Sequence, residues 1–149
     1  LAQRYYLQAY SLTREAGDDL HGAFILRILA HNGMDIRRPE HTLDLAEAAL
    51  ARVAGRVDPA TGALFAITRA RALANAGRGT EAAAQTRVAQ DLAARGDEAG
   101  LPFHAALWGS ARATVSSHTA KTFRALGDHV NAERHYAAAA RGRRDPERR

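Results

Sequence analysis

The sequence of 149 residues contains no cysteine, one methionine and one tryptophan, and aromatic residues make up only 6% of it. The absence of cysteine excludes a disulfide framework and any metal site built on thiolates. No apolar run approaches the roughly 20 residues that a membrane-spanning helix needs, and no signal peptide is visible. Strand-forming residues are sparse and never alternate over a long run. These absences favour a cytoplasmic protein without β-sheet.

Alanine dominates what is present: it supplies 35 residues of a chain that is 46% hydrophobic. Alanine has the highest helix propensity and lets helices pack closely, so we predict an all-α fold. Asp58 and Thr80 are predicted N-caps. The chain starts at Leu1, inside a predicted helix, and we interpret it as part of a longer protein. The predicted helices, seven in number, cover residues 2–16, 19–36, 39–54, 60–76, 80–95, 112–126 and 128–141.

The positive charge comes almost entirely from arginine, with 20 arginines and the single lysine Lys121 giving a net charge of +5. Five arginines lie within residues 141–149 against Asp145 and Glu147, so this segment supplies +3 of the total. We interpret residues 142–149 as a solvated basic tail or the start of a further repeat. Nucleic-acid binding through this Arg-rich segment is the alternative.

Two turn sequences resemble each other, ANAGRGTEA at residues 74–82 and ALGDHVNA at residues 125–132. Each places a glycine directly after a helix, where the left-handed backbone conformation favours glycine, and an alanine five residues later. Residues 37–39 form a looser third copy, with Pro39 in the first turn of a helix. Aligned on these turns, the equivalent positions are Ala2, Thr42, Ala82 and Ala132, with spacings of 40, 40 and 50 residues.

These turns divide a helical domain of residues 1–141 into repeat units at about 1–18, 19–58, 59–97 and 111–142. The longer last spacing reflects an insertion at residues 98–110, where Pro102 suits the start of a short extra helix. Phe103, Leu107 and Trp108 would pack this helix against the array. We interpret the insertion as an apolar plug over a widened joint, with a binding wall or lid as the alternative.

The units resemble the tetratricopeptide repeat, although their period of about 40 residues exceeds the usual 34. In the fourth unit the family's small, large, turn, small, aromatic and small positions are occupied by Ala120, Phe123, Gly127, Ala132, Tyr136 and Ala139. The third unit keeps Ala70, Leu73, Gly77, Ala82 and Ala89 but has Thr86 where an aromatic is usual. The resemblance implies a right-handed superhelix of antiparallel helix pairs and a module that binds proteins or peptides.

The phrases HGAFILR at residues 21–27 and RARALA at residues 69–74 resemble the C-terminal regulatory part of bacterial helix-turn-helix transcription regulators. That resemblance implies the ligand-sensing or scaffold part of a cytoplasmic transcriptional regulator. DNA contact would then require an N-terminal domain that this chain does not include.

In a tetratricopeptide superhelix the first helix of each unit lines the concave face. Spacings of three or four residues place side chains on a shared helix face, and arginine forks suit carboxylates. We therefore predict a polar, net positive groove that binds a peptide segment or its acidic end. The predicted groove residues are Arg27, His31, Asp35, Arg71, Asn75, Ser117, Lys121 and Arg124.

We expect no enzymatic activity, and therefore predict no catalytic residue, metal or cofactor. No pair of the seven histidines has the spacing of a zinc-binding helix with its glutamate. Neither a nucleophile elbow nor a phosphate-binding Gly-Lys-Ser/Thr loop is present. Ser116, Ser117 and His118 are neighbours, but consecutive helical side chains point apart. Self-assembly through apolar faces of incomplete end repeats is a further alternative to peptide binding.

Overall fold

The computed structural model describes residues 2–35, 38–97, 99, 102 and 109–144, and every secondary-structure element given for this part of the chain is a helix. The predictions of an all-α fold and of seven helices are confirmed for these residues. Each predicted boundary lies within one residue of the observed one, except that the last helix continues to Arg144. The helices are α1 (Ala2–Glu15), α2 (Asp19–Asp35), α3 (Pro39–Val53), α4 (Pro59–Asn75), α5 (Gly79–Arg95), α7 (Ala111–Ala125) and α8 (His129–Arg144).

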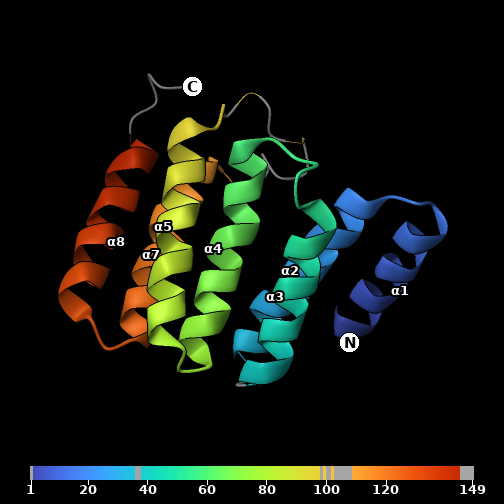
Figure 1. The fold of residues 1–149 in the computed structure, drawn as a ribbon, viewed down its shortest axis with the longest axis horizontal. Coiled ribbons are helices and arrows are strands. Elements are labelled where there is room, and N and C mark those ends of the chain that lie inside the picture. The colour runs from blue at the N-terminus through green and yellow to red at the C-terminus, as the bar shows by residue number, and fades with distance from the viewer. Residues whose placement is uncertain (1, 36–37, 98, 100–101, 103–108, 145–149) are drawn as a thin grey trace.

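Consecutive helices pack as hairpins, with α2 against α3, α4 against α5, and α7 against α8. The hairpins stand side by side in a row that runs from α1 at one end to α8 at the other (Figure 1). Helix α4 lies at the centre, since it also contacts α2, α3 and α7. The predicted extra helix with Phe103, Leu107 and Trp108 lies outside the described residues.

The turns after α4 and α7 follow the sequence pattern closely. Gly77 and Gly127 adopt φ angles of 75° and 79°, as predicted for glycines in the left-handed conformation. After α4, the Arg78 amide donates to the Leu73 carbonyl at 2.9 Å and the Gly77 amide to the Ala74 carbonyl at 3.1 Å. This pair of bonds is the Schellman arrangement, which satisfies the last carbonyls of the helix and reverses the chain.

The helix starts confirm one predicted N-cap and contradict the other. The Asp58 side chain accepts a hydrogen bond from the Thr61 amide at 3.0 Å at the start of α4. Thr80, in contrast, lies inside α5, which begins at Gly79 with Arg78 at its N-cap position. The Schellman turn uses residues up to Arg78, so the next helix starts before Thr80, and the prediction for Thr80 was wrong.

The core is built from small residues that let helices approach closely. The repeat positions Thr42, Ala82 and Ala132 are all buried, and Phe65 and Ile67 of α4 fill the centre of the molecule. The Phe65 ring lies 4.9 Å, centroid to centroid, from that of Phe24 on α2. Close packing of this kind explains why alanine replaces larger residues at the helix crossings.

Helices α2 and α3 meet closely at Gly33 and Thr42. A Cβ added at Gly33 would clash with the hydroxyl of Thr42, which is itself buried and without a hydrogen-bond partner among the described residues. Glycine at position 33 therefore makes room for a threonine at a position that is alanine in later units.

Candidate functional site

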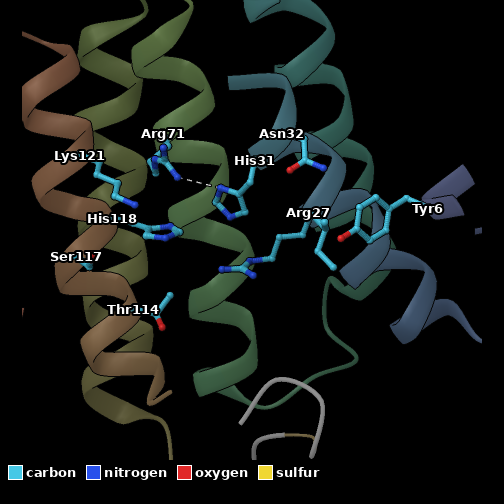
Figure 2. A pocket seen from close by; sticks show the side chains of 10 residues that line it. Tyr6, Arg27, His31, Asn32, Arg71, Thr114, Ser117, His118 and Lys121 are labelled. Carbon is cyan, nitrogen blue, oxygen red and sulfur yellow. Dashed lines mark hydrogen bonds between the residues drawn. The ribbon is translucent and has the colours of Figure 1, made fainter. Parts of the chain in front are cut away.

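A cavity of about 370 Å³ lies where α2, α4 and α7 meet, and α1 contributes one residue to its wall (Figure 2). Its volume is within the range of small-molecule sites. Among the described residues, no aspartate or glutamate lines it. The lining residues are Tyr6, Arg27, Ile28, His31, Asn32, Arg71, Thr114, Ser117, His118 and Lys121.

Helical spacing brings these side chains together. Arg27 and His31 are four residues apart on α2, and Ser117 and Lys121 are four apart on α7, so each pair shares one face of its helix. Arg71 reaches the cavity from α4, between the other two helices (Figure 2). Three cationic side chains from three helices thus face one space.

Arg27 is the most deeply placed of the three cations, with only 6% of its surface exposed. Its Nε donates to the Thr68 hydroxyl at 3.0 Å and to the Leu64 carbonyl at 3.2 Å, which fixes the base of the guanidinium. No carboxylate in the part of the chain that the structure describes pairs with it. Burial, and then the charge of Arg71, lower the pKa of Arg27 to about 10, so it still carries its charge at neutral pH.

His31 links two of the cations through a hydrogen-bond network. Its Nδ1 lies 2.9 Å from Nη1 of Arg71, and its Nε2 lies 3.3 Å from the Thr68 hydroxyl. Arginine only donates, so Nδ1 must accept, and the proton of a neutral His31 is on Nε2. The Thr68 hydroxyl in turn donates to the Leu64 carbonyl at 2.8 Å. Burial and the charges of Arg27, Arg71 and Lys121 lower the pKa of His31 to about 2, so His31 is neutral.

His118 packs edge-on against His31, with 4.8 Å between the ring centroids and 78° between the ring planes. Burial, followed by His31 and the cations around it, lowers the pKa of His118 well below its usual range. Its Nδ1 is buried and has no hydrogen-bond partner among the described residues. Both imidazoles are therefore neutral, and they add hydrogen-bonding nitrogens to the site without adding charge.

The structure brings five of the eight predicted groove residues to the cavity wall: Arg27, His31, Arg71, Ser117 and Lys121. Asn75 is exposed, with its amide nitrogen donating to the Arg71 carbonyl at 2.9 Å, and does not line the cavity. Arg124 is exposed and also lies outside it. The side chain of Asp35 lies outside the described residues.

Sequence reasoning did not include Tyr6, Asn32 and His118 among the groove residues. His118 had a detectable signal, since it lies four residues after Thr114 and three before Lys121 on the same helix face. Tyr6 had no such signal in the sequence, because its place in the cavity wall depends on how α1 packs against α2. His118 is not among the predicted groove residues, whereas the structure puts it beside His31 in the cavity.

Metal ligands do not gather at this site or elsewhere in the described ranges, where no group of three or more histidines, aspartates or glutamates has a geometry suited to a metal ion. Among the same residues, no helix is both long enough and apolar enough to cross a membrane.

Comparison with protein-family models, with curated proteins and with solved structures gives no significant match to this chain. The described part of the chain is an all-helical array of hairpins with a cationic cavity where α2, α4 and α7 meet. We therefore infer the function from this geometry.

Proposed function

We propose that this chain is a tetratricopeptide-like binding module that takes an acidic group of a protein or peptide segment into the cavity between α2, α4 and α7. The observation that carries the proposal is Arg27, a buried cation on the cavity wall without a carboxylate partner among the described residues. A buried charge is costly unless it is paired, and an acidic ligand would provide the missing pair.

The arrangement of the hairpins supports the tetratricopeptide-like part of the proposal. The first helices of three successive units, α2, α4 and α7, supply nine of the ten cavity residues that the structure describes, as expected for a concave face lined by first helices. A right-handed superhelical course is the arrangement we propose for the units.

Binding fits the site better than catalysis does. A histidine whose pKa is about 2 is a weak base, and catalytic acids and bases work best with pKa values near the operating pH. Ser117 and His118 share the wall, but no hydrogen bond activates the serine hydroxyl within the described structure. We therefore propose a non-enzymatic role.

The wider role that we propose is the ligand-sensing or scaffold part of a cytoplasmic transcriptional regulator. The support for it is the resemblance of residues 21–27 and 69–74 to such regulators. In that role DNA would be contacted by another domain, and the cavity would report the presence of its ligand through the packing of neighbouring hairpins.

Charge reversal inside the cavity tests the binding proposal. We expect the Arg71→Glu/Lys121→Glu variant to bind an acidic peptide at least tenfold more weakly than the native chain, measured by fluorescence anisotropy. The matched control is Arg87→Glu/Arg134→Glu, which changes the net charge equally at two exposed positions outside the cavity. Equal losses in both variants would show attraction to overall charge alone, and the cavity assignment would fail.

Self-association is a second candidate, favoured by apolar side chains at the two ends of the row. Tyr5 and Leu12 of α1 are each 64% exposed, and Val130 of α8 is 74% exposed. A second copy of the chain would cover such faces. Sedimentation of the native chain and of Leu12→Lys tests whether the chain self-associates. A native chain that is monomeric at high concentration contradicts self-association.

A further inference from the structure

The cavity holds more positive charge than a single carboxylate neutralises. Arg27 of α2, Arg71 of α4 and Lys121 of α7 all line it, and none of the lining residues that the structure describes is acidic. The cations interact with one another, since Arg71 opposes the charge of Arg27 and all three oppose protonation of His31. A ligand with one negative charge would relieve only part of this repulsion.

The cations also approach from different sides. Figure 2 shows Lys121 reaching into the cavity from α7 on one side and Arg27 from α2 on the other, with Arg71 on α4 between these helices. A planar carboxylate is matched by one arginine fork, which uses both of its oxygens. Three cations on three helices instead suit a group with three terminal oxygens that point in different directions.

Because His31 and His118 are neutral, they do not increase the positive charge that a bound ligand must neutralise. Protonation of both would add two positive charges to the wall, but His31 and His118 stay neutral at physiological pH. The site therefore presents three formal cations together with uncharged hydrogen-bonding groups, among them Ser117 and Tyr6.

We propose that the anionic group bound in this cavity is a phosphate monoester, held as a dianion between Arg27, Arg71 and Lys121. Such a group carries a charge of about −1.5 to −2 at neutral pH and has three strong acceptor oxygens. The proposal rests on the proposed function, because it places the ligand in the same cavity, and it narrows the chemistry of the group that is bound. A cavity of about 370 Å³ also has room for part of the molecule that carries the phosphate.

Arg27 is positioned to act as the rigid part of this site. Its Nε is held by Leu64 and Thr68, so the two Nη groups remain for the ligand and the side chain has little freedom left to lose on binding. The Thr68 hydroxyl also contacts His31, which contacts Arg71, so one network fixes two of the three cations.

The first test compares phenyl phosphate with benzoate, which differ mainly in the anionic group. By calorimetry at about pH 7.5, we expect phenyl phosphate to bind at least tenfold more tightly, because more of the cavity charge is neutralised. Equal affinity, or tighter binding of benzoate, would overturn the phosphate assignment and leave the proposed acidic-ligand site standing. Binding of neither probe would overturn both.

The pH dependence gives a second readout. The second pKa of a phosphate monoester is about 6, so its dianion fraction falls about fourfold between about pH 7.5 and 5.5, and affinity should fall by a similar factor. The titratable and charged groups that face the ligand are Tyr6, Arg27, His31, Arg71, His118 and Lys121. The pKa values of Arg27, about 10, and of His31, about 2, lie outside this range, and that of His118 is far below it. Affinity that rises on acidification would contradict a bound dianion.

Variants locate the probe in the cavity. We expect Arg27→Met and Lys121→Met each to weaken phenyl phosphate binding at least tenfold, whereas Arg87→Met, at an exposed position on α5, leaves it unchanged. Thermal unfolding establishes that each variant is folded, and Lys121→Met decides alone if Arg27→Met does not fold. Unchanged affinity in Lys121→Met and in a folded Arg27→Met would overturn the site.

The source of the phosphate is distinguished by a second probe, a short peptide with a central phosphoserine flanked by glycines. Tighter binding of this peptide than of phenyl phosphate supports a phosphorylated side chain of a partner segment. Tighter binding of phenyl phosphate supports a small phosphorylated molecule. The same peptide with unmodified serine must bind at least tenfold more weakly, and equal binding would overturn the phosphate assignment.

Discussion

Two arginines on α4, only two residues apart, face different surroundings. Arg69 donates from Nε and Nη2 to the Glu47 carboxylate at 3.1 and 2.9 Å, and from Nη1 to Gln85 at 2.9 Å. Arg71 points into the cavity and donates to a neutral imidazole, that of His31. The first arginine joins α3, α4 and α5 through acceptors that the chain itself provides. The second belongs to a wall whose described residues include three cations and no acidic group.

The same contrast extends along the two sides of the row. We define the outer seam as the contacts of α2 and α4 with α3 and α5 through Gly33, Thr42, Glu47, Arg69 and Gln85. In the outer seam most polar groups are satisfied within the fold, and the packing is close. In the cavity, the charged Arg27 is buried, and the pKa values of His31 and His118 are lowered. Keeping these groups buried costs stability, which is typical of sites built for a ligand. A change of pH and substitutions on each side can test this contrast.

Acidification should destabilise the cavity and leave the outer seam unaffected. The unfolded pKa of histidine is about 6.5, whereas the folded pKa of His31 is about 2 and burial lowers the pKa of His118 well below its usual range. The stability from keeping them neutral is complete above about pH 6.5 and is lost as the pH falls, because only the unfolded chain takes up protons. Between about pH 6.5 and 5 the loss is about 2 kcal/mol for each histidine.

Chemical unfolding of the native chain and of His31→Gln/His118→Gln at both pH values checks this prediction. The double variant should lose most of the pH dependence in this window. A native chain whose unfolding free energy is the same at both pH values would contradict the buried, neutral state of the two rings.

Gly33→Ala should destabilise the outer seam by about 2 kcal/mol, because the new methyl group clashes with the Thr42 hydroxyl. Thr42→Ala should restore most of this stability, since it removes the clashing oxygen, which has no hydrogen-bond partner among the described residues. A double-mutant cycle of unfolding free energies measures the coupling. Additive effects of the two substitutions would show that the helices do not meet at these residues.

Arg27→Met should raise stability by about 1 kcal/mol while it abolishes ligand binding. Lowering the pKa of Arg27 from 12.5 to about 10 corresponds to a cost of about 3 kcal/mol that is fully present at neutral pH and disappears only as the pH rises towards 12.5. Loss of its hydrogen bonds offsets about 2 kcal/mol of that gain. No acceptor is orphaned, because Thr68 still contacts His31 and the Leu64 carbonyl still accepts from Thr68. Chemical unfolding measures the change, and a marked loss of stability would assign Arg27 a structural role.

Arg69→Met is the matched substitution in the outer seam, and it should lower stability where Arg27→Met raises it. We expect a loss of about 0.5–1 kcal/mol, because the Arg69–Glu47 pair is partly exposed, and no change in ligand affinity. Chemical unfolding and the same binding assay measure the two effects. Weaker ligand binding in this variant would mean that the two sides of α4 are not independent.

The helices and their turns could be predicted from the sequence because their signals are local. Gly77 and Gly127 mark helix ends, and Asp58 marks a helix start, through contacts within a few residues. The prediction of Thr80 as an N-cap was wrong because the turn before it determines where α5 begins. Local signals of this kind do not describe the course of the hairpins in space.

The site was predictable in part, because similar turn sequences can be aligned in the sequence. Aligned turns place Arg27, Arg71 and Lys121 on equivalent helices, which is enough to bring them to one face. They do not show how far along each helix the cavity extends, and Asn75 and Arg124 lie beyond it. His31 contacts His118, and Tyr6 of α1 joins the wall, only because neighbouring hairpins pack together. The sequence of one hairpin does not encode that packing.

Thermal unfolding of the native chain, Arg27→Met and Arg69→Met, each with and without phenyl phosphate, shows whether the ligand binds around Arg27. A ligand that binds only the folded state raises its stability. We expect phenyl phosphate to stabilise the native chain and Arg69→Met to the same extent and to leave the stability of Arg27→Met unchanged. Equal stabilisation of all three would contradict the claim that the cavity around Arg27 is the ligand site.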